Sequence, residues 1–274
     1  MDFTKFSNSS ENKLIGLIAG ETVLYTTTMI GLGSLWYMDY PKSNFHFFDD
    51  NAEWMQMDKA GHFVTAYYLN ELETDMYRWA GVEEQKAIWL GGTIGTVFLL
   101  SIEVFDAFSS DWGASSGDLI ANTTGSLLAI GQALKWNEQR IQVKYSYKPS
   151  QWADMNPEKL GNNHLERALK DYNGQTYWLS FNMKSLLQID NENFPNWLSL
   201  SLGHSGNGMI SALQKENQPQ RKRQFLLSLD IDLNKIKTKN KTLNSVLHTF
   251  GFLKFPAPAV ELKKGKLYFH PIYY

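Results

Sequence analysis

Apolar residues recur at helical spacing, or fill long stretches, four times before residue 140. The four stretches run from Lys13 to about Tyr37, from about Ala52 to Trp79, from Glu84 to Phe108, and from Ser116 into residues 138–142. Stretches of this length and pattern predict helices, and short connections make consecutive helices antiparallel neighbours. The first part of the chain is therefore expected to form a four-helix bundle.

After residue 145 the pattern changes to an alternation of apolar and polar positions, which is typical of strands. The alternation occurs in QTYWLSFNM (175–183), NWLSLSLGH (196–204), QFLLSLDIDL (224–233) and KLYFHPIYY (266–274). We therefore predict an α+β fold in two domains. An N-terminal four-helix, membrane-associated bundle occupies residues 1–145, and a mixed, mainly β domain occupies 146–274.

Two alternatives stay open for the relation of the helices to a membrane. The first, third and fourth helices have apolar cores that make credible membrane segments. The second helix carries Glu71, Glu73 and Asp75, which do not belong in contact with lipid. A mean hydropathy of −0.34 is typical of a water-soluble protein, so a soluble bundle of apolar helices is the other alternative.

Charge and cysteine content exclude several classes of function. The net charge is only −2, which provides no global field for nucleic acid. The two halves differ, however, because residues 1–135 carry a net charge of −10 and residues 136–274 one of +8. The chain has no cysteine, which excludes disulfides, cysteine zinc sites, thiol nucleophiles and a lipid-modified cysteine within these residues.

Polar residues gather at corresponding ends of the second, third and fourth helices. Each helix carries one pair at a spacing of three or four residues, namely Asp58 and His62, Glu103 and Asp106, and Asp118 and Asn122. Residues at this spacing share a helix face. The second helix begins where the third ends and the fourth begins, so the three pairs are expected to meet at one end of the bundle.

Three kinds of chemistry suit such a cluster. His62, oriented by Asp58 or Glu103, is a candidate general base with these acids as catalytic partners. His62, Glu103 and Asp118 are candidate ligands of a divalent metal such as zinc, manganese or magnesium. A hydrogen-bond network that only joins the helices is the third alternative.

The charges also predict an orientation for a membrane-spanning bundle. Lys and Arg residues, including Arg78, Lys86 and Lys135, concentrate at the end opposite the polar cluster. An excess of Lys and Arg marks the cytoplasmic side. The cluster is therefore expected to face the periplasm.

Several motifs together resemble a known family. They are FHFFDDN at 45–51, MDKAGH at 57–62, IEVFD at 102–106, WGASSGD at 112–118 and KDYNGQTYWLS at 170–180. The chain resembles the YfiM-like proteins, described as predicted periplasmic lipoproteins, in the Bacteroidota version with a C-terminal extension. This resemblance covers most of the chain and implies a place in the cell envelope, but it implies no activity.

A more distant similarity is to VanZ-like membrane proteins. It consists of an Asp-Lys-x-x-His element ending at His62 and of Glu103, followed by an Asp-x-x-x-Asn-x-x-Gly element that begins at Asp118. This similarity adds Lys59 to Asp106, Asp118 and Asn122 as candidate ligand-binding residues. The arginine usual between the two elements in that group is missing.

We expect a cell-envelope protein with a binding or scaffold role at the membrane. Its cluster would engage a lipid head group or an ion, or lock the helices together. The alternative is a membrane-linked, metal-assisted hydrolase or transferase acting on a phosphorylated lipid or glycan, with His62 as its base. A soluble periplasmic structural protein is a third hypothesis. The expected partners are a membrane or lipid head group and other envelope proteins, and not nucleic acid.

Overall fold

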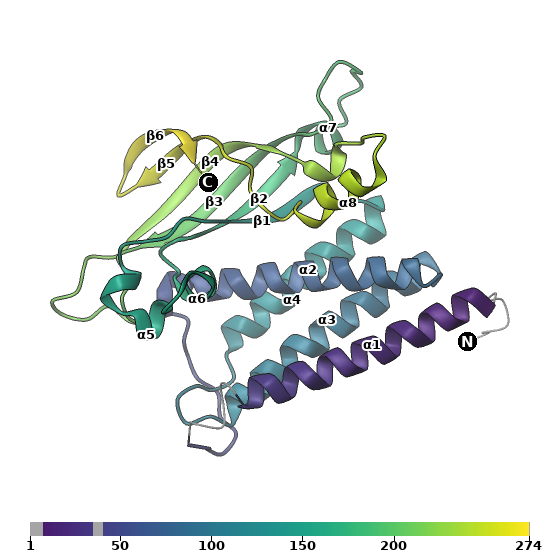
Figure 1. Cartoon of the computed structure of the whole chain (residues 1–274). Helices are drawn as coiled ribbons and strands as arrows, with labels where there is room; N and C mark the ends of the chain where they lie inside the picture. Colours follow the sequence, from purple (N-terminus) through teal and green to yellow (C-terminus); the bar gives the residue numbers. More distant parts are fainter. Residues whose placement is uncertain (1–7, 35–40, 274) are drawn as a thin grey trace. The chain divides into compact units, whose positions relative to one another are not determined.

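The computed structural model describes residues 8–34 and 41–273. One compact unit combines the residues up to Asn51 with His62–Glu138, and the other combines Ala52–Gly61 with Gln139–Tyr274. Helices make up the first unit and an antiparallel sheet dominates the second (Figure 1), which confirms the α+β prediction. The predicted domain limit at residue 145 stays a prediction.

The helical unit contains four long helices. The first turn of the second of them belongs to the sheet unit. They are α1 (Asn8–Leu32), α2 (Met57–Trp79), α3 (Glu84–Ala107) and α4 (Ser116–Trp136). The predicted end of the first helix at Tyr37 lies outside the described residues. The prediction that the fourth helix continues into residues 138–142 is wrong. Asn137 adopts a left-handed conformation (φ 54°) and donates its N–H to Ala133 O, which ends the helix.

Glycines let α2, α3 and α4 approach one another closely. A Cβ on Gly125 of α4 would lie 2.3 Å from the carbonyl oxygen of Phe63 in α2, and one on Gly91 of α3 would lie 2.5 Å from Thr74 N. Polar side chains join the same helices, since Asn70 Nδ2 donates to Ser126 Oγ over 2.8 Å. Small residues and internal hydrogen bonds are typical of tight helix contacts in apolar surroundings.

Helix α1 packs against α2 and α3 through a small apolar core. Leu17, Tyr77, Ala80 and Ala87 are buried together there. Tyr77 Oη also donates a hydrogen bond of 2.8 Å to the Glu21 carboxylate of α1. A buried phenol thus provides a hydrogen bond to one oxygen of a carboxyl group on a mainly apolar helix.

Two of these helices are long and apolar enough to span a membrane, by length and composition alone. They are Ser10–Leu32 and Glu84–Ala107. The first lies near the start of the chain, where a signal sequence has the same length and polarity. Helix α4, which was also expected to be a credible membrane segment, does not meet the same criteria of length and apolar composition.

The sheet unit is a six-stranded antiparallel meander in the order β1 to β6 (Figure 1). Its strands are β1 (Ile141–Tyr147), β2 (Gln175–Asn182), β3 (Leu198–Asn207), β4 (Lys222–Ile231), β5 (Ala257–Lys263) and β6 (Lys266–Tyr273). Alternation in the sequence predicted β2, β3, β4 and β6. It missed β1, which was assigned in part to a helix, and β5.

Short helices occupy the connections of the sheet unit. They are η2 (Glu53–Gln56), η3 (Ala153–Met155), α5 (Pro157–Leu160), α6 (His164–Lys170), α7 (Met183–Leu187), η4 (Leu233–Lys235) and α8 (Lys241–Thr249). Three residues of η2, Trp54, Met55 and Gln56, have positive φ values of 44°, 54° and 61°. Left-handed backbone at a run of residues with side chains is costly, so contacts in this unit must hold the turn in place.

Candidate functional site

Three helices of the helical unit bring His62, Glu103 and Asp118 together. His62 lies near the beginning of α2, Glu103 near the end of α3, and Asp118 in the first turn of α4. One ligand atom of each residue lies within 4.8 Å of those of the other two. The predicted convergence of the three helix ends is therefore confirmed for these residues, while their roles stay predictions.

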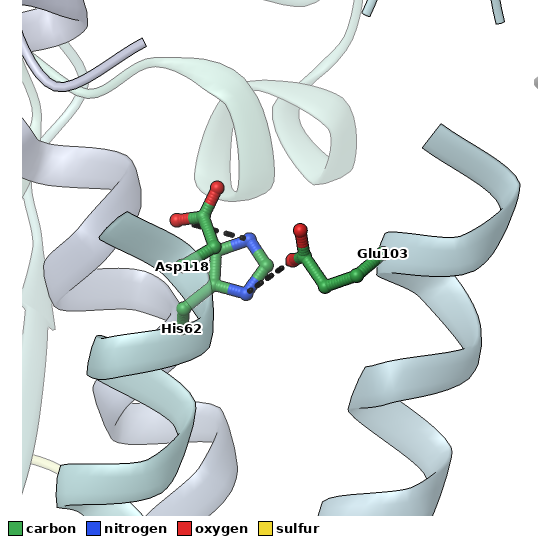
Figure 2. A group of neighbouring side chains, drawn as sticks. All are labelled: His62, Glu103 and Asp118. Carbon is green, nitrogen blue, oxygen red and sulfur yellow. Dashed lines mark ion pairs between the residues drawn. The ribbon is translucent and has the colours of Figure 1, made fainter. Parts of the chain in front are cut away.

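The His62 imidazole lies between the two carboxylates (Figure 2). Its Nδ1 is 3.9 Å from Glu103 Oε1, and its Nε2 is 3.7 Å from Asp118 Oδ1. The side chains of Glu103 and Asp118 are 4% and 9% exposed, whereas that of His62 is 26% exposed. Two buried carboxylates thus face one ring that solvent can reach.

Asn122 orients the ring from the next turn of α4. Its Oδ1 lies 3.1 Å from His62 Nδ1, so with the amide oxygen facing the ring, Nδ1–H donates to Asn122. Asn122 is 1% exposed, and its Nδ2 has no hydrogen-bond partner within the described chain. In this tautomer, His62 Nε2 presents a lone pair on the side of Asp118.

The loop between α3 and α4 positions the acidic residues. Ser115 N donates to Glu103 Oε2 over 3.1 Å, which directs the other oxygen, Oε1, toward His62. Ser115 Oγ accepts from Asp118 N at 3.1 Å, as the N-cap of α4, and donates to Asp50 Oδ1 over 2.6 Å. Ser115 therefore caps α4 and also orients the carboxylates of Glu103 and Asp50 through hydrogen bonds.

Sequence reasoning began the fourth helix at Ser116 and gave no role to Ser115, which the structure shows as the N-cap of α4. The spacing Ser115-x-x-Asp118 resembles a capping box, with a hydroxyl followed three residues later by an acid, and was the available signal. Asp50 was not among the predicted site residues. Its contact with Ser115 depends on the fold of the loop that precedes α2 and has no local sequence signal.

The other predicted site residues lie outside the group formed by His62, Glu103 and Asp118. Asp58 precedes His62 by one helical turn on α2, and its Oδ2 accepts a hydrogen bond of 3.1 Å from Lys59 Nζ. These two residues belong to the segment Ala52–Gly61 of the sheet unit. Asp106 follows Glu103 on the same end of α3 and is half-buried.

The two ring-to-carboxylate distances in the cluster are too long for direct hydrogen bonds, and the one to Asp118 is close to the separation of two ligands of one ion. A hydrogen bond between nitrogen and oxygen spans about 2.7–3.2 Å, shorter than either ring-to-carboxylate distance. Two ligands each about 2.1 Å from a tetrahedral zinc lie roughly 3.4 Å apart, close to the 3.7 Å between His62 Nε2 and Asp118 Oδ1. One imidazole nitrogen with two carboxylate oxygens suits zinc or manganese.

The described chain also contains a cavity in the sheet unit, with a volume of about 370 Å³. Trp152, Glu261 and His270 are among its lining residues. Glu261 is held by His270 Nε2 at 2.7 Å and Lys263 Nζ at 3.2 Å. Burial raises the pKa of Glu261, but hydrogen bonds from Gln224 and His270 outweigh it and hold that pKa below its usual value. The Glu261 carboxylate is already paired with its own neighbours. We therefore place the candidate functional site at His62 and not at this cavity.

Comparison with known proteins adds one family. Residues 46–132 match the family described as "Predicted periplasmic lipoprotein (DUF2279)". The matched segment contains His62, Glu103, Asp118 and Asn122. Searches of curated proteins and of solved structures each found no match.

The family match supports a place in the cell envelope. A periplasmic lipoprotein faces the periplasm and is associated with a membrane, and the matched segment covers α2, α3 and most of α4, which form the cluster. The narrower resemblances to YfiM-like and VanZ-like proteins, the identity of the membrane and the side that the cluster faces stay predictions.

Proposed function

We propose that this envelope protein binds a divalent cation through His62, Glu103 and Asp118. The observation that carries the proposal is the meeting of one imidazole and two buried carboxylates, from three helices, within 4.8 Å. Asp118 Oδ1 already lies beside His62 Nε2, whereas Glu103 Oε1 lies beside Nδ1 and would have to rotate toward Nε2 to reach the same ion. A cation compensates the two buried negative charges, whose burial is otherwise costly.

Asn122 and Ser115 support the cluster without contacting the ion. Asn122 Oδ1 accepts from His62 Nδ1 and leaves Nε2 for the metal. Ser115 N binds one oxygen of Glu103 and leaves the other for the metal. Such partners fix the tautomer and the direction of metal ligands, and their loss typically weakens metal binding by about 10–100-fold.

Metal titration of the purified full chain tests this proposal. We expect one zinc or manganese ion per chain, measured by elemental analysis and calorimetry. His62→Ala and Asp118→Asn should each weaken binding by more than about 100-fold, since removal of a ligand costs more than loss of a supporting residue. Asn122→Ala should lie in the range of about 10–100-fold.

Asp106→Asn is the matched control. It removes a carboxylate from the same end of α3, three residues from Glu103, and should leave metal affinity unchanged. Metal added at about 100 times Kd should also stabilise the wild type by about 2.7 kcal/mol, and should not stabilise His62→Ala. Wild-type protein that binds no ion and gains no stability would show that the cluster is only a hydrogen-bond network.

A second candidate function rests on the number of ligands. Three protein ligands leave at least one coordination position for water or for a phosphate oxygen. The cluster then suits a metal-assisted hydrolase acting on a phosphorylated lipid: the bound metal would activate a water for attack on phosphorus, and the P–O bond to the lipid alcohol would break. Phosphate release from phosphatidic acid vesicles by the metal-loaded wild type, absent in Asp118→Asn, would support this function, and metal binding without turnover would limit the site to binding.

A further inference from the structure

The strands of the sheet unit turn polar side chains inward. Ser201, Ser205, Gln224, Ser228 and Glu261 alternate with exposed apolar positions of β3, β4 and β5, and all five are less than 9% exposed. An antiparallel sheet with one solvated face normally has its apolar side inward and its polar side outward. The polarity of these strands is therefore reversed. Since buried polar groups are costly without hydrogen bonds, the inward face needs polar partners.

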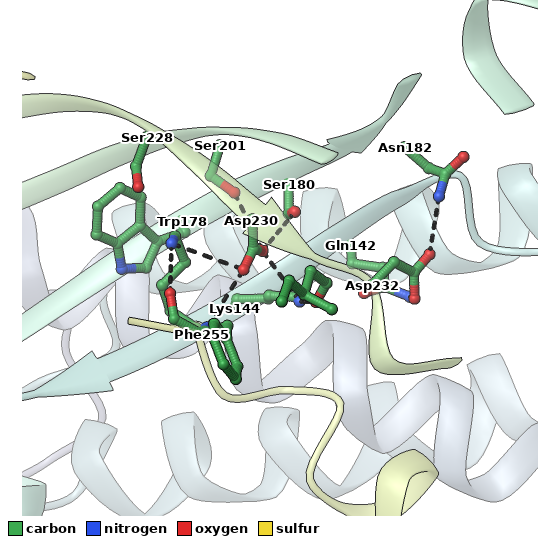
Figure 3. A network of polar contacts seen from close by, with 12 residues as sticks. Gln142, Lys144, Trp178, Ser180, Asn182, Ser201, Ser228, Asp230, Asp232 and Phe255 are labelled. Carbon is green, nitrogen blue, oxygen red and sulfur yellow. Dashed lines mark hydrogen bonds and ion pairs between the residues drawn. The ribbon is translucent and has the colours of Figure 1, made fainter. Parts of the chain in front are cut away.

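The protein supplies these partners itself at one end of the inward face (Figure 3). Asp230 lies 3.0 Å from Lys144 Nζ and 3.6 Å from Lys254 Nζ, and all three side chains are fully buried. Ser180 and Ser201 donate hydrogen bonds of 2.7 and 3.2 Å to the same carboxylate. The Asp230 end of the face is therefore satisfied by neighbouring side chains.

At the other end of the same strands, the inward face borders the cavity of about 370 Å³. Leu226, which lies between Asp230 and Gln224 on β4, is buried in an apolar cluster with Trp178. Gln224 lies beyond this cluster and lines the cavity together with Glu261 of β5. The apolar cluster thus separates the filled part of the polar face from a part that borders open space.

The lining of the cavity offers both hydrogen-bond donors and acceptors. Gln224 Nε2 donates to Glu261 Oε1 over 2.6 Å, which leaves Gln224 Oε1 as an acceptor. His270 Nε2 donates to Glu261 Oε2 over 2.7 Å, which leaves His270 Nδ1 for another partner. Trp152 Nε1 donates to Asn207 Oδ1 over 3.3 Å, which leaves the amide nitrogen of Asn207 as a donor. A ligand in the cavity can therefore exchange hydrogen bonds in both directions.

Two aromatic side chains, Trp152 and Tyr273, also line the cavity. Trp152 is half-buried, and its hydrogen bond to Asn207 restricts the direction of its ring. Tyr273 packs edge-on against Trp178, with ring centres 5.7 Å apart, and its Oη lies 3.2 Å from Thr176 Oγ1. Rings held by such contacts offer apolar area to a ligand at little cost in conformational entropy.

The charges of the lining disfavour several classes of ligand. Glu261 is paired with His270 and Lys263, and its pKa lies below the usual value, so it carries a negative charge that repels phosphate. The donors around this carboxylate, Lys263 above all, repel a cation. Lys148, the other lysine of the lining, is exposed, so that water and salt screen its charge. An acyl chain would desolvate the polar side chains without giving them a hydrogen bond.

We propose that this cavity binds a saccharide of one or two rings. Sugar hydroxyls both donate and accept, which suits the acceptors of Gln224 and Glu261 and the amide nitrogen of Asn207. The C–H groups on one face of a pyranose ring stack on the electron-rich face of an aromatic ring, and Trp152 provides such a face.

The size and place of the cavity fit this ligand. Its volume of about 370 Å³ is near the lower end of the range of about 300–1,000 Å³ for small-molecule sites, which suits a short saccharide. The cavity belongs to the sheet unit, so the saccharide site does not depend on the cation site at His62.

Isothermal titration calorimetry of the purified full chain tests the proposal. The probes are three uncharged disaccharides, cellobiose, maltose and di-N-acetylchitobiose, with inorganic phosphate as the competitor. We expect at least one disaccharide to bind saturably, with one molecule per chain, and phosphate not to displace it. Trp152→Ala should weaken this binding by about tenfold or more, as for the loss of a central aromatic contact. Trp197→Ala is the matched control, because it removes a 38% exposed ring of the same unit from outside the lining and should leave the affinity unchanged.

A measurement on the wild type makes the test independent of how the variants fold. Saturating sugar should slow amide hydrogen exchange in the segment 148–152, which lines the cavity, and should leave exchange in α8 of the same unit unchanged. Three results would overturn the proposal. They are no saturable binding of any of the three disaccharides, equal affinity in Trp152→Ala and the wild type, and displacement of the sugar by phosphate, which would assign the cavity to an anion.

Discussion

At the scale of one residue, burial in the sheet unit changes the pKa of Lys254. Its ammonium group contacts Asp230, donates to Leu229 O and Phe255 O over 2.8 and 2.7 Å, and lies 5.0 Å from the centre of the Trp178 ring. Burial lowers the pKa of Lys254 from 10.5 to about 8, although Asp230 acts in the opposite direction. The folded protein therefore loses this proton at a lower pH than the unfolded chain.

This difference predicts a pH dependence of stability. Between about pH 8 and 10.5 the unfolded chain holds more protons at Lys254 than the folded protein does. The free energy of unfolding should accordingly rise with pH through this window. Below pH 8 both states keep this proton, so Lys254 adds no pH dependence there. Denaturant unfolding from pH 8 to about 9, below the range in which unfolded tyrosines with a pKa of about 10 titrate, should show the rise.

Lys254→Met is the variant that assigns this effect to one group. It keeps the length and apolar character of the side chain and should flatten the rise in unfolding free energy. An equal slope in the variant and in the wild type would mean that another group is responsible.

At the scale of elements, the contact between α2 and α4 depends on the absence of one side chain. A Cβ at Gly125 would lie 2.3 Å from Phe63 O and 3.1 Å from the Ala66 Cβ, so one of the two helices would have to move. This contact lies between Asn122 and Ser126, which join α4 to α2 through hydrogen bonds. The packing of glycine therefore determines the distance between His62 and Asn122.

Two alanine substitutions in α4 separate packing from helix propensity. Gly125→Ala should destabilise the helical unit by about 1–3 kcal/mol, the usual cost of overpacking. Gly131→Ala, where no atom lies within 4 Å of the new Cβ, should stabilise it by about 0.5–1 kcal/mol because alanine favours helix. Thermal unfolding followed by circular dichroism at 222 nm measures both, and equal effects would contradict the close approach of α2 and α4.

At the scale of the whole molecule, the sheet unit is built from two separate segments of the chain. Residues Ala52–Gly61 precede most of the helical unit in sequence but belong to the sheet unit. Trp54 N donates to Ala212 O over 2.9 Å, and the Trp54 ring packs against Tyr172 with ring centres 5.4 Å apart. Gln56 also accepts a hydrogen bond from Arg223. These contacts hold the left-handed turn before α2.

Loss of the Trp54 ring should loosen this segment. An aromatic pair contributes about 0.5–1.5 kcal/mol, so amide hydrogen exchange at position 54 should become roughly 2- to 12-fold faster in Trp54→Ala. Trp197→Ala removes a 38% exposed ring from the same unit and should leave this exchange unchanged. Equal rates in Trp54→Ala and the wild type would mean that the backbone bond to Ala212 holds the segment alone.

Local patterns in the sequence were sufficient to predict the four long helices and four of the six strands. Helical periodicity and strand alternation both report which face of an element is apolar, and the helices pack through such faces. The convergence of His62, Glu103, Asp118 and Asn122 also followed from sequence, since residues four apart share a helix face and short loops alternate helix direction.

Only the tertiary structure could decide the remaining features. The beginning of strand β1 was assigned to a helix. That helix, α4, in fact ends at Asn137, whose left-handed conformation the sequence pattern did not indicate. Alternation along β3 and β4 showed two faces but not which of them is buried, because period-two alternation is the same whichever side faces solvent. Burial of Asp230 with Lys144 and Lys254 reverses the expected polarity, since pairing makes a charged interior tolerable. The sequence by itself thus determined the elements and the ends at which polar residues meet, and long-range pairing decided which face of the sheet is exposed to solvent.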